Sequence, residues 1–394
     1  MLDLDATLRD ELAAVAAADR YRRRRVVEII DPATPMRVQV DGRECCNFCS
    51  NDYLGIATHM EIRQAMSAAV ERYGVGSGAA HLVTGHSPEH HALEEELAEF
   101  VGRERALLFS TGYMANLGIA SALLKRGDAV FEDRLNHASL LDAGLSSGAR
   151  FGRYRHNDSE DLRKDLSGSD AQRKLVMSDG VFSMDGDIAP LNALADVCAQ
   201  HDAVLMIDDA HGFGVLGDRG QGSVHAAQLS ARQVPVYMAT LGKAAGVAGA
   251  FVAGSNELIE TLIQKARTYI YTTAAPPAVA AASRAALRVI QRESWRREHL
   301  LQLIARFRQG ATQSGLQLMD SPTAIQPVVF GSEAAALQAS DALLAAGLLV
   351  SAIRPPTVPV GTARLRITLS AAHSEQDVDR LLDVLSQYVS SQVP

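Results

Sequence analysis

A lysine that follows an apolar strand is the residue in this sequence best suited to covalent chemistry. Lys243 comes after the apolar run Val236–Thr240 and is flanked by the small residues 242 and 244–246. An amine becomes a nucleophile only after it loses its proton, which burial or nearby positive charge promotes by lowering its pKa. The small neighbours leave space for a planar ligand against the backbone. An ordinary surface lysine fits these apolar surroundings poorly.

Two acids stand at the end of another apolar run. Asp208 and Asp209 follow residues 204–207, and His211 comes three residues after Asp208. In an open parallel sheet, ligands bind beyond the carboxyl ends of the strands, where a carboxylate can hold a cofactor cation. His211 can turn back to the same place. Taken alone, this motif is explained equally well by solvated acids at a strand end.

A glycine turn supplies a third element. Residues 109–116 read FSTGYMAN, an apolar strand end, a turn at Gly112 and a helix start at which Tyr113 or its backbone could contribute. Exposed N–H groups at a helix N-terminus bind phosphate, although many such junctions have no ligand. The three elements together are a phosphate cradle, a partner for a pyridine nitrogen and a lysine for a Schiff base. Sites for pyridoxal 5'-phosphate (PLP) need all three.

Two further polar residues lie near predicted strand ends. His137, in the string NHAS, is more typical of a helix cap when the residues alone are considered, although it could stack on a cofactor ring. Ser183 lies in a turn after the strand at 175–177 and would face the same edge of the sheet. Without the neighbouring motifs, it would be interpreted as a turn serine.

The elements that must position these residues alternate along the chain. Between about 60 and 250, helical segments such as 89–101 and 191–200 alternate with short apolar strands at 106–109, 129–131, 175–177, 204–207, 236–240 and 250–253. This pattern predicts an α/β fold with a large, mostly parallel sheet covered by helices on both faces. We predict a large domain at 56–290, preceded by an N-terminal helix (5–25, with Arg22–Arg25 near its end) and an extended segment within 1–55.

A smaller α+β domain is predicted at 291–394. Helical segments continue to about residue 315, followed by strands at 326–330, 348–353 and 363–369 and by helices at 334–346 and 374–388.

The bulk properties exclude several classes of protein. Of the 394 residues, 47% are hydrophobic and 21% are charged, which is typical of a globular chain. A net charge of −8 gives no broad attraction to nucleic acid, and Arg22–Arg25 alone are a weak footprint for it. No apolar run is long enough to span a bilayer, and the first residues do not resemble a signal peptide, so we expect a cytoplasmic protein. Cys46 and Cys49 form a CxxC without a second pair, so no metal site is expected.

These residues and several longer strings resemble the α-oxoamine synthases, fold-type-I PLP-dependent transferases, over nearly the whole chain. The strings are SNDYLG (50–55), HNDS (156–159), DGVFSMDGDIAPL (179–191), IDDAHGFGVLG (207–217) and AIRPPTVPVGTARLRITLSAAH (352–373). The last string, with Arg354 and Thr357, is similar to the branch that condenses L-alanine with a pimeloyl thioester in biotin biosynthesis. The resemblance does not say whether coenzyme A or acyl carrier protein carries the acyl group.

The resemblance also implies a role for each site residue. Lys243 corresponds to the Schiff-base lysine and the base, Asp208 to the partner of the pyridine nitrogen and His211 to the contact with the ring hydroxyl. His137 would stack over the ring, which reverses the preference for a cap alone. The other implied cofactor contacts are Gly112, Tyr113, Ser183, Thr240 and, from a neighbouring subunit of a homodimer, Thr272 and Thr273. The implied substrate contacts are Arg22, Asn51, His137, Arg354 and Thr357.

The sequence departs from the family pattern in three places, and two other functions remain as alternatives. Tyr113 stands where phenylalanine is common, Ala244-Ala245 follow the lysine where Gly-Phe is frequent, and the segment 76–81 is less glycine-rich. A ligase using glycine and acetyl-CoA shares the same chemistry. A catalytically silent partner subunit shares the fold, but it would be expected to lack the lysine.

Overall fold

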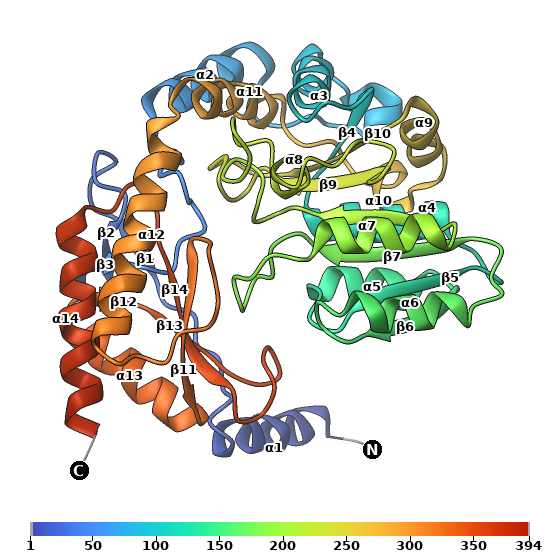
Figure 1. The fold of residues 1–394 in the computed structure, drawn as a ribbon. Coiled ribbons are helices and arrows are strands. Elements are labelled where there is room, and N and C mark those ends of the chain that lie inside the picture. Colours follow the sequence, from blue (N-terminus) through green and yellow to red (C-terminus); the bar gives the residue numbers. More distant parts are fainter. Residues whose placement is uncertain (1–2, 393–394) are drawn as a thin grey trace. The chain divides into compact units, whose positions relative to one another are not determined.

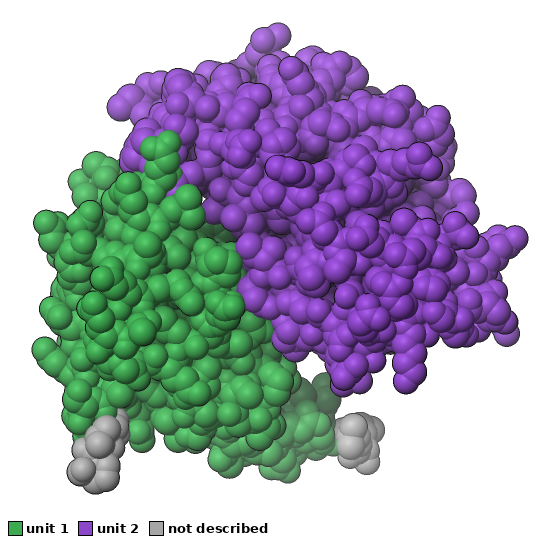
Figure 2. All heavy atoms as spheres, in the orientation of Figure 1, with its two compact units in different colours: residues 1–53, 184–186, 298–394 green, residues 54–183, 187–297 purple. Residues whose placement is uncertain are grey.

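The computed structural model describes residues 3–392, which divide into two compact units (Figure 2). Unit 1 contains the chain up to Tyr53, residues 184–186 and the chain from Glu298 onward; unit 2 contains residues 54–183 and 187–297. The N-terminal segment and the C-terminal region therefore belong to one unit. The predicted boundaries near 55 and 290 stay predictions, and residues 1–2 and 393–394 of the predicted domains lie outside the described residues.

A seven-stranded sheet forms the centre of unit 2 (Figure 1). Its strands are parallel except β10, which pairs antiparallel with both β4 and β9. In the order β4-β10-β9-β8-β7-β5-β6, the strands are Arg105–Phe109, Ala250–Gly254, Val236–Thr240, Val204–Asp208, Lys174–Asp179, Ala129–Asp133 and Arg150–Tyr154. The carboxyl ends of the six parallel strands therefore share one edge, which is where the chemistry is predicted.

Helices cover both faces of this sheet, as Figure 1 shows. Alternate strand residues, including Leu107, Met177, Met206 and Met238, form one buried cluster with residues of α4, α5, α9 and α10. The helices of unit 2 are α2 (Met60–Tyr73), a π-helical turn η1 (His81–Gly85), α3 (Pro88–Phe100), α4 (Gly112–Leu123), α5 (Ala138–Ser146), α6 (Ser159–Ser167), α7 (Leu191–Gln200), α8 (Ser223–Ala226), α9 (Asn256–Lys265), α10 (Arg267–Ile270) and α11 (Pro277–Arg292).

Unit 1 contains two small sheets. One has the order β1-β2-β3-β12 (Val27–Ile29, Arg37–Val40, Arg43–Asn47, Leu348–Leu349), and the other has the order β11-β14-β13 (Ile325–Gly331, Ala363–Thr368, Ser351–Ile353). Its helices are α1 (Leu4–Ala17), α13 (Glu333–Ala345), α14 (Glu375–Gln392) and α12 (Trp295–Gln313), of which the residues from Glu298 belong to this unit. The predicted fold class, a helix-covered sheet with a smaller α+β part, is confirmed.

Two local predictions in unit 1 are wrong. The first helix ends at Ala17 instead of near residue 25, and Asp19 adopts a positive φ of 53° that a helix cannot continue through. Arg22–Arg25 therefore lie in an extended segment and not at a helix C-terminus. The single strand predicted at 348–353 is divided between β12 and β13, which pair in different sheets.

The two cysteines of the CxxC lie in different environments. Cys46 lies in β3, where burial raises the pKa of its thiol to about 12 and keeps it protonated at neutral pH. Cys49 lies beyond the strand, and both are free thiols.

Candidate active site

Lys243 lies in the short connection between β9 and β10, at the carboxyl edge of the sheet. Its Nζ is 2.7 Å from Nε2 of His211, which follows β8. Backbone hydrogen bonds within the connection hold its shape. Gly246 N–H donates to the Lys243 carbonyl at 2.8 Å, and Val247 N–H donates to the Leu241 carbonyl at 3.0 Å. Gly246 has a φ of +67°, and a Cβ there would lie 2.6 Å from the backbone nitrogen of Ala57. The turn that holds the lysine is therefore specified by glycine.

The two alanines after the lysine are part of the core. Ala244 and Ala245 are each 1% exposed, and a Cβ on Gly214 would lie only 2.7 Å from the Cβ of Ala244. The space beside Lys243 is thus filled by backbone and small side chains. A bulkier residue at position 244 would require Gly214 to move.

Asp208 ends β8 with its carboxylate buried at 3% exposure. One oxygen, Oδ2, accepts a hydrogen bond from Nδ2 of Asn116 at 2.8 Å, and Oδ1 accepts one from the N–H of Ala210 at 3.0 Å. Asn116 itself is fully buried on α4. The carboxylate is therefore held in a fixed orientation from two sides.

Asp209 has a different environment from its neighbour. Its Oδ2 accepts hydrogen bonds from the Tyr237 hydroxyl at 2.9 Å and from the Ser223 N–H at 2.7 Å. Burial raises the pKa of Asp209 to about 7, although these hydrogen bonds act in the opposite direction. The two acids of the motif therefore separate into one that belongs to the site and one that ties the α8 region to the sheet.

A chain of hydrogen bonds connects Asp208 with His137. Asn116 Nδ2 also donates to Oγ of Ser139 at 2.8 Å, and Oγ of Ser139 lies 2.7 Å from Nδ1 of His137. Nδ1 of His137 also accepts from the N–H of Ser139 at 3.3 Å, so the ring caps α5 as the residues alone predicted. Burial lowers the pKa of His137, with Asp208 raising it and Lys243 lowering it further. The charges of Asp208 and Lys243 therefore both act on the ring of His137.

Asp179 is another buried carboxyl at this edge. It ends β7 directly opposite Asp208 in the strand register and accepts the backbone N–H of His137 at 2.6 Å. Burial, followed by the charge of Asp208, raises the pKa of Asp179 well above its ordinary value. Asp179 and Asp208 therefore form a pair of neighbouring buried carboxyl groups.

The other predicted cofactor contacts lie around the same edge. Phe109 and Thr240 both pair with Ala250, so β4 and β9 end at the same level of the sheet, with β10 between them, and the turn at Gly112 begins at this edge. Gly112 is the first residue of α4, and Tyr113, 41% exposed, donates its hydroxyl proton to Asp142. The hydroxyl of Thr240 donates to the Gly249 carbonyl at 2.9 Å.

Two more of these predicted contacts lie in loops of unit 2. Ser183 is in the turn after β7, and Thr273 is exposed beyond the end of α10.

Four predicted substrate contacts belong to unit 1. Nη2 of Arg22 donates to Oγ1 of Thr357 at 3.2 Å, so two of the four touch each other. Nη1 of Arg354 donates to the Asp19 carbonyl at 2.5 Å.

The fourth substrate contact, Asn51, has a partner that the sequence reasoning missed. Oδ1 of Asn51 accepts from Nη2 of Arg366 at 3.3 Å. Arg366 is buried on β14, and an arginine between Leu365 and Ile367 of a predicted strand is the signal that could have identified it.

The sequence also did not single out Asn116, Ser139 and Asp179 in unit 2. Asn116 is a polar residue one turn into an apolar helix, which is a usable signal because a buried amide needs partners. Ser139 and Asp179 could not be distinguished from an ordinary helix start and strand end.

A cavity of about 810 Å³ lies elsewhere in unit 2. Its lining includes Leu175, Val204 and Val236, which are at or next to the amino ends of β7, β8 and β9. It is therefore at the edge of the sheet opposite Lys243. Size alone does not identify the reactive site, because the nucleophile and its charged neighbours are at the other edge.

Comparison with known proteins identifies the family of this chain. The family model described as aminotransferase class I and II matches residues 43–385. The 8-amino-7-oxononanoate synthase of Cellvibrio japonicus is 62% identical over 388 residues, which cover 98% of this chain and 97% of that protein. A serine palmitoyltransferase of S. paucimobilis, solved with a PLP–myriocin adduct, has a TM-score of 0.93 and 30% identity and covers 99% of both chains.

A solved 8-amino-7-oxononanoate synthase is also similar. The protein from Francisella tularensis has a TM-score of 0.78 and 30% identity, and the match covers 89% of this chain and 99% of that one. The chain therefore belongs to the aminotransferase class I and II family, in the group whose curated members are named 8-amino-7-oxononanoate synthase.

Proposed function

We propose that this chain is the PLP-dependent acyltransferase that condenses L-alanine with a pimeloyl thioester to give 8-amino-7-oxononanoate. The alanine α-carbon loses its proton and forms a bond to the thioester carbonyl carbon as the thiol leaves. The bond from the α-carbon to the alanine carboxylate then breaks to release carbon dioxide, and a proton returns to the α-carbon. The observation that carries the proposal is the amine of Lys243, 2.7 Å from the ring of His211, beside the buried carboxylate of Asp208. Identity near 60% to synthases of this name over almost the full chain supports it.

The residues at the edge of the sheet fit PLP. Asp208 would hold the pyridine nitrogen, His211 the ring hydroxyl, and the start of α4 at Gly112 and Tyr113 the cofactor beside Ser183 and Thr240. When bound, the cofactor supplies an electron sink for charge that develops at the substrate α-carbon. A carboxylate fixed by two hydrogen-bond donors suits a cationic ring nitrogen, because an opposite charge favours the protonated form.

The chain's own side chains would transfer the alanine α-proton and bind the substrates. Lys243 takes the proton from the α-carbon of alanine and later returns one, and His211 orients the amine through the 2.7 Å contact. His137 presents its neutral ring to the reacting face, since burial lowers its pKa. We assign Arg22 and Thr357 to the acyl substrate, and Arg354 and Asn51 to the carboxylate of the amino acid or product.

We infer that the working form is a cytoplasmic homodimer in which Thr273 reaches the phosphate bound by the neighbouring subunit. Thr273 is exposed in a loop after α10, which suits a contact made to another chain. No helix within residues 3–392 is long and apolar enough to cross a membrane. Full activity from a monomer in analytical ultracentrifugation would contradict the shared site.

A product assay tests the proposed reaction. Holoenzyme is supplied with alanine plus pimeloyl-CoA, alanine plus pimeloyl-acyl carrier protein, glycine plus acetyl-CoA, and serine plus palmitoyl-CoA, and products are measured by mass spectrometry. We expect 8-amino-7-oxononanoate from one or both pimeloyl donors. Turnover confined to glycine or serine would replace the proposal by one of those activities, and no turnover with any pair would indicate the silent-subunit alternative.

A further inference from the structure

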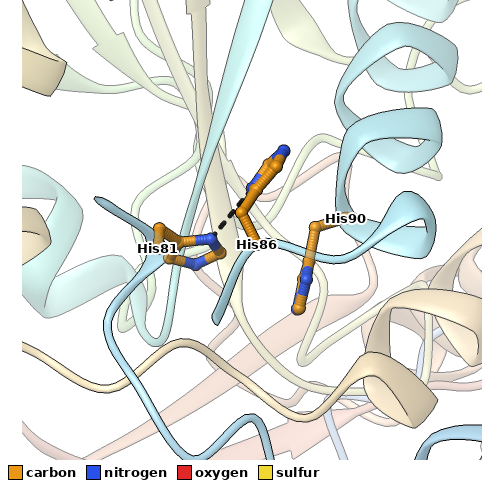
Figure 3. A group of neighbouring side chains, drawn as sticks. All are labelled: His81, His86 and His90. Carbon is orange, nitrogen blue, oxygen red and sulfur yellow. Dashed lines mark hydrogen bonds between the residues drawn. The ribbon is translucent and has the colours of Figure 1, made fainter. Parts of the chain in front are cut away.

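A cluster of histidines lies in unit 2, on and before α3, in residues that the proposed reaction does not use. His81 begins the turn η1, His86 follows it, and His90 is in the first turn of α3 (Figure 3). His91 is the next residue of the same turn. These four are a third of the twelve histidines in the chain. The first of them, His81, ends the segment 76–81, which departs from the family pattern. The earlier expectation of no metal rested on the cysteines and did not consider this group.

Two of the four histidines have structural positions. His90 is fully buried, and both of its ring nitrogens are occupied: Nδ1 accepts the Ser87 N–H at 3.0 Å, and Nε2 lies 2.7 Å from the Ala275 carbonyl. His81 stacks on Tyr269 with ring centroids 5.2 Å apart and an interplanar angle of 11°. Its Nδ1 is 3.1 Å from Nδ1 of His86, the contact drawn in Figure 3. His81 therefore fixes the ring of His86 through Nδ1.

The opposite nitrogen of His86 faces a carboxylate. Nε2 of His86 is 4.0 Å from Oε2 of Glu94, while the other oxygen of Glu94, Oε1, accepts the Leu108 N–H at 3.0 Å. His91 precedes Glu94 by three residues on α3, so both side chains lie on neighbouring positions of one helix surface. One ligand atom from each of His86, His91 and Glu94 can be chosen so that all lie within 4.8 Å of one another.

We propose that His86, His91 and Glu94 bind a divalent transition-metal ion of the zinc class, with His81 as the residue that positions His86. Imidazole nitrogens and a carboxylate are zinc ligands with bond lengths of about 2.0–2.2 Å, so a tetrahedral site separates the ligand atoms by about 3.3–3.6 Å. Small side-chain rotations close the 4.0 Å separation to that value. The side chain of His91 is 67% exposed, and its Nε2 lies 3.5 Å from Oε1 of Glu95.

The second ring nitrogen of His86 already has a hydrogen-bond partner. Metal-bound histidines usually place their second nitrogen in a hydrogen bond, as His86 does with His81. Bound metal would join η1 to α3.

Zinc binding to the tag-free holoenzyme tests this proposal without any activity measurement. We expect isothermal titration with zinc chloride to show one ion per chain. His91→Ala and Glu94→Gln should each weaken binding at least tenfold, and His81→Ala should weaken it about 10- to 100-fold as a positioning residue. His225→Ala, which changes an exposed histidine of α8, serves as the matched control and should bind zinc as wild type does.

The variants also identify a metal bound elsewhere. The side chain of His91 is mostly exposed, so His91→Ala is expected to fold, which thermal melting checks. X-ray absorption should report nitrogen and oxygen ligands at about 2.0–2.2 Å. Wild-type protein that binds no zinc, or His91→Ala and Glu94→Gln proteins that bind it as tightly as wild type, would overturn the proposal. Neither result bears on the condensation reaction.

Discussion

Replacing Asn116 by alanine removes the side chain that holds Asp208 toward the site. In the protein, Nδ2 of Asn116 donates to Oδ2 of Asp208 at 2.8 Å and also connects to Ser139. A hydrogen bond to a charged group contributes about 1.5–3 kcal/mol. If this bond acts on the alignment of the carboxylate during reaction, its loss corresponds to a decrease in kcat of roughly 10- to 150-fold.

The assay separates alignment from folding. We expect Asn116→Ala to retain bound PLP, with a reduced kcat and with a KM for the pimeloyl thioester within about threefold of wild type, because Asn116 touches Asp208 and no predicted acyl contact. Thermal melting and the cofactor absorption spectrum are recorded on the same samples. Ser121→Ala changes an exposed residue of the same helix and should leave kcat unchanged.

Asn116→Asp distinguishes electrostatics from packing. Aspartate has nearly the shape of asparagine, so a packing role predicts almost normal activity. It replaces the donor by a second carboxyl about 2.8 Å from Asp208, and two carboxylates at such a distance cannot both be ionised. We therefore expect a loss at least as large as that of the alanine variant. Near-normal kcat for either well-folded variant would refute the reasoning.

Three other predictions concern the lysine, the partly buried contacts of a histidine with two aspartates, and the acyl contact. Lys243→Ala should lose the covalent cofactor spectrum and lower turnover by at least about 10²–10⁴-fold, whereas Lys265→Ala should not; normal turnover would refute the central assignment. Burial lowers the pKa of His156, but its two aspartate partners outweigh this and raise it to about 10. The resulting stabilisation is complete below the unfolded pKa of about 6.5 and is lost as pH rises through 10, so the difference in Tm between wild type and His156→Gln should shrink from pH 7 to pH 10. Arg22→Ala should raise the KM for the pimeloyl thioester about 10- to 150-fold, as loss of one charged hydrogen bond predicts, and an unchanged KM, equal to that of Arg9→Ala, would remove Arg22 from the substrate contacts.

The sheet was predictable because its strands are short apolar runs with abrupt polar ends. Residues 204–207 and 236–240 predict buried strands, and the observed β8 and β9 agree to within one residue. Lys243, Asp208 and His211 follow these strands, so their common edge could also be predicted. The limits of the first helix could not, because its arginines continue a helix-compatible composition past the positive φ at Asp19.

The connections among site residues were less predictable. Nothing in the acid pair alone shows that Asp208 accepts from Asn116 while Asp209 accepts from Tyr237, since this depends on side chains far along the chain. The histidine cluster was missed although His86, His91 and Glu94 are close together in the sequence. Their spacing alone does not show that the side chain of His86, which lies before α3, approaches that of Glu94 on the helix.

The antiparallel placement of β10 limits how the reactive amine can travel. A parallel neighbour would require a long crossover connection, whereas β9 and β10 are joined by nine residues, 241–249, that carry their own hydrogen bonds. The backbone of Lys243 is therefore anchored at both ends. Each time the amine leaves and returns, the displacement must come from rotation about the bonds of its side chain, so the recovery of the enzyme between turnovers requires no rearrangement of the main chain.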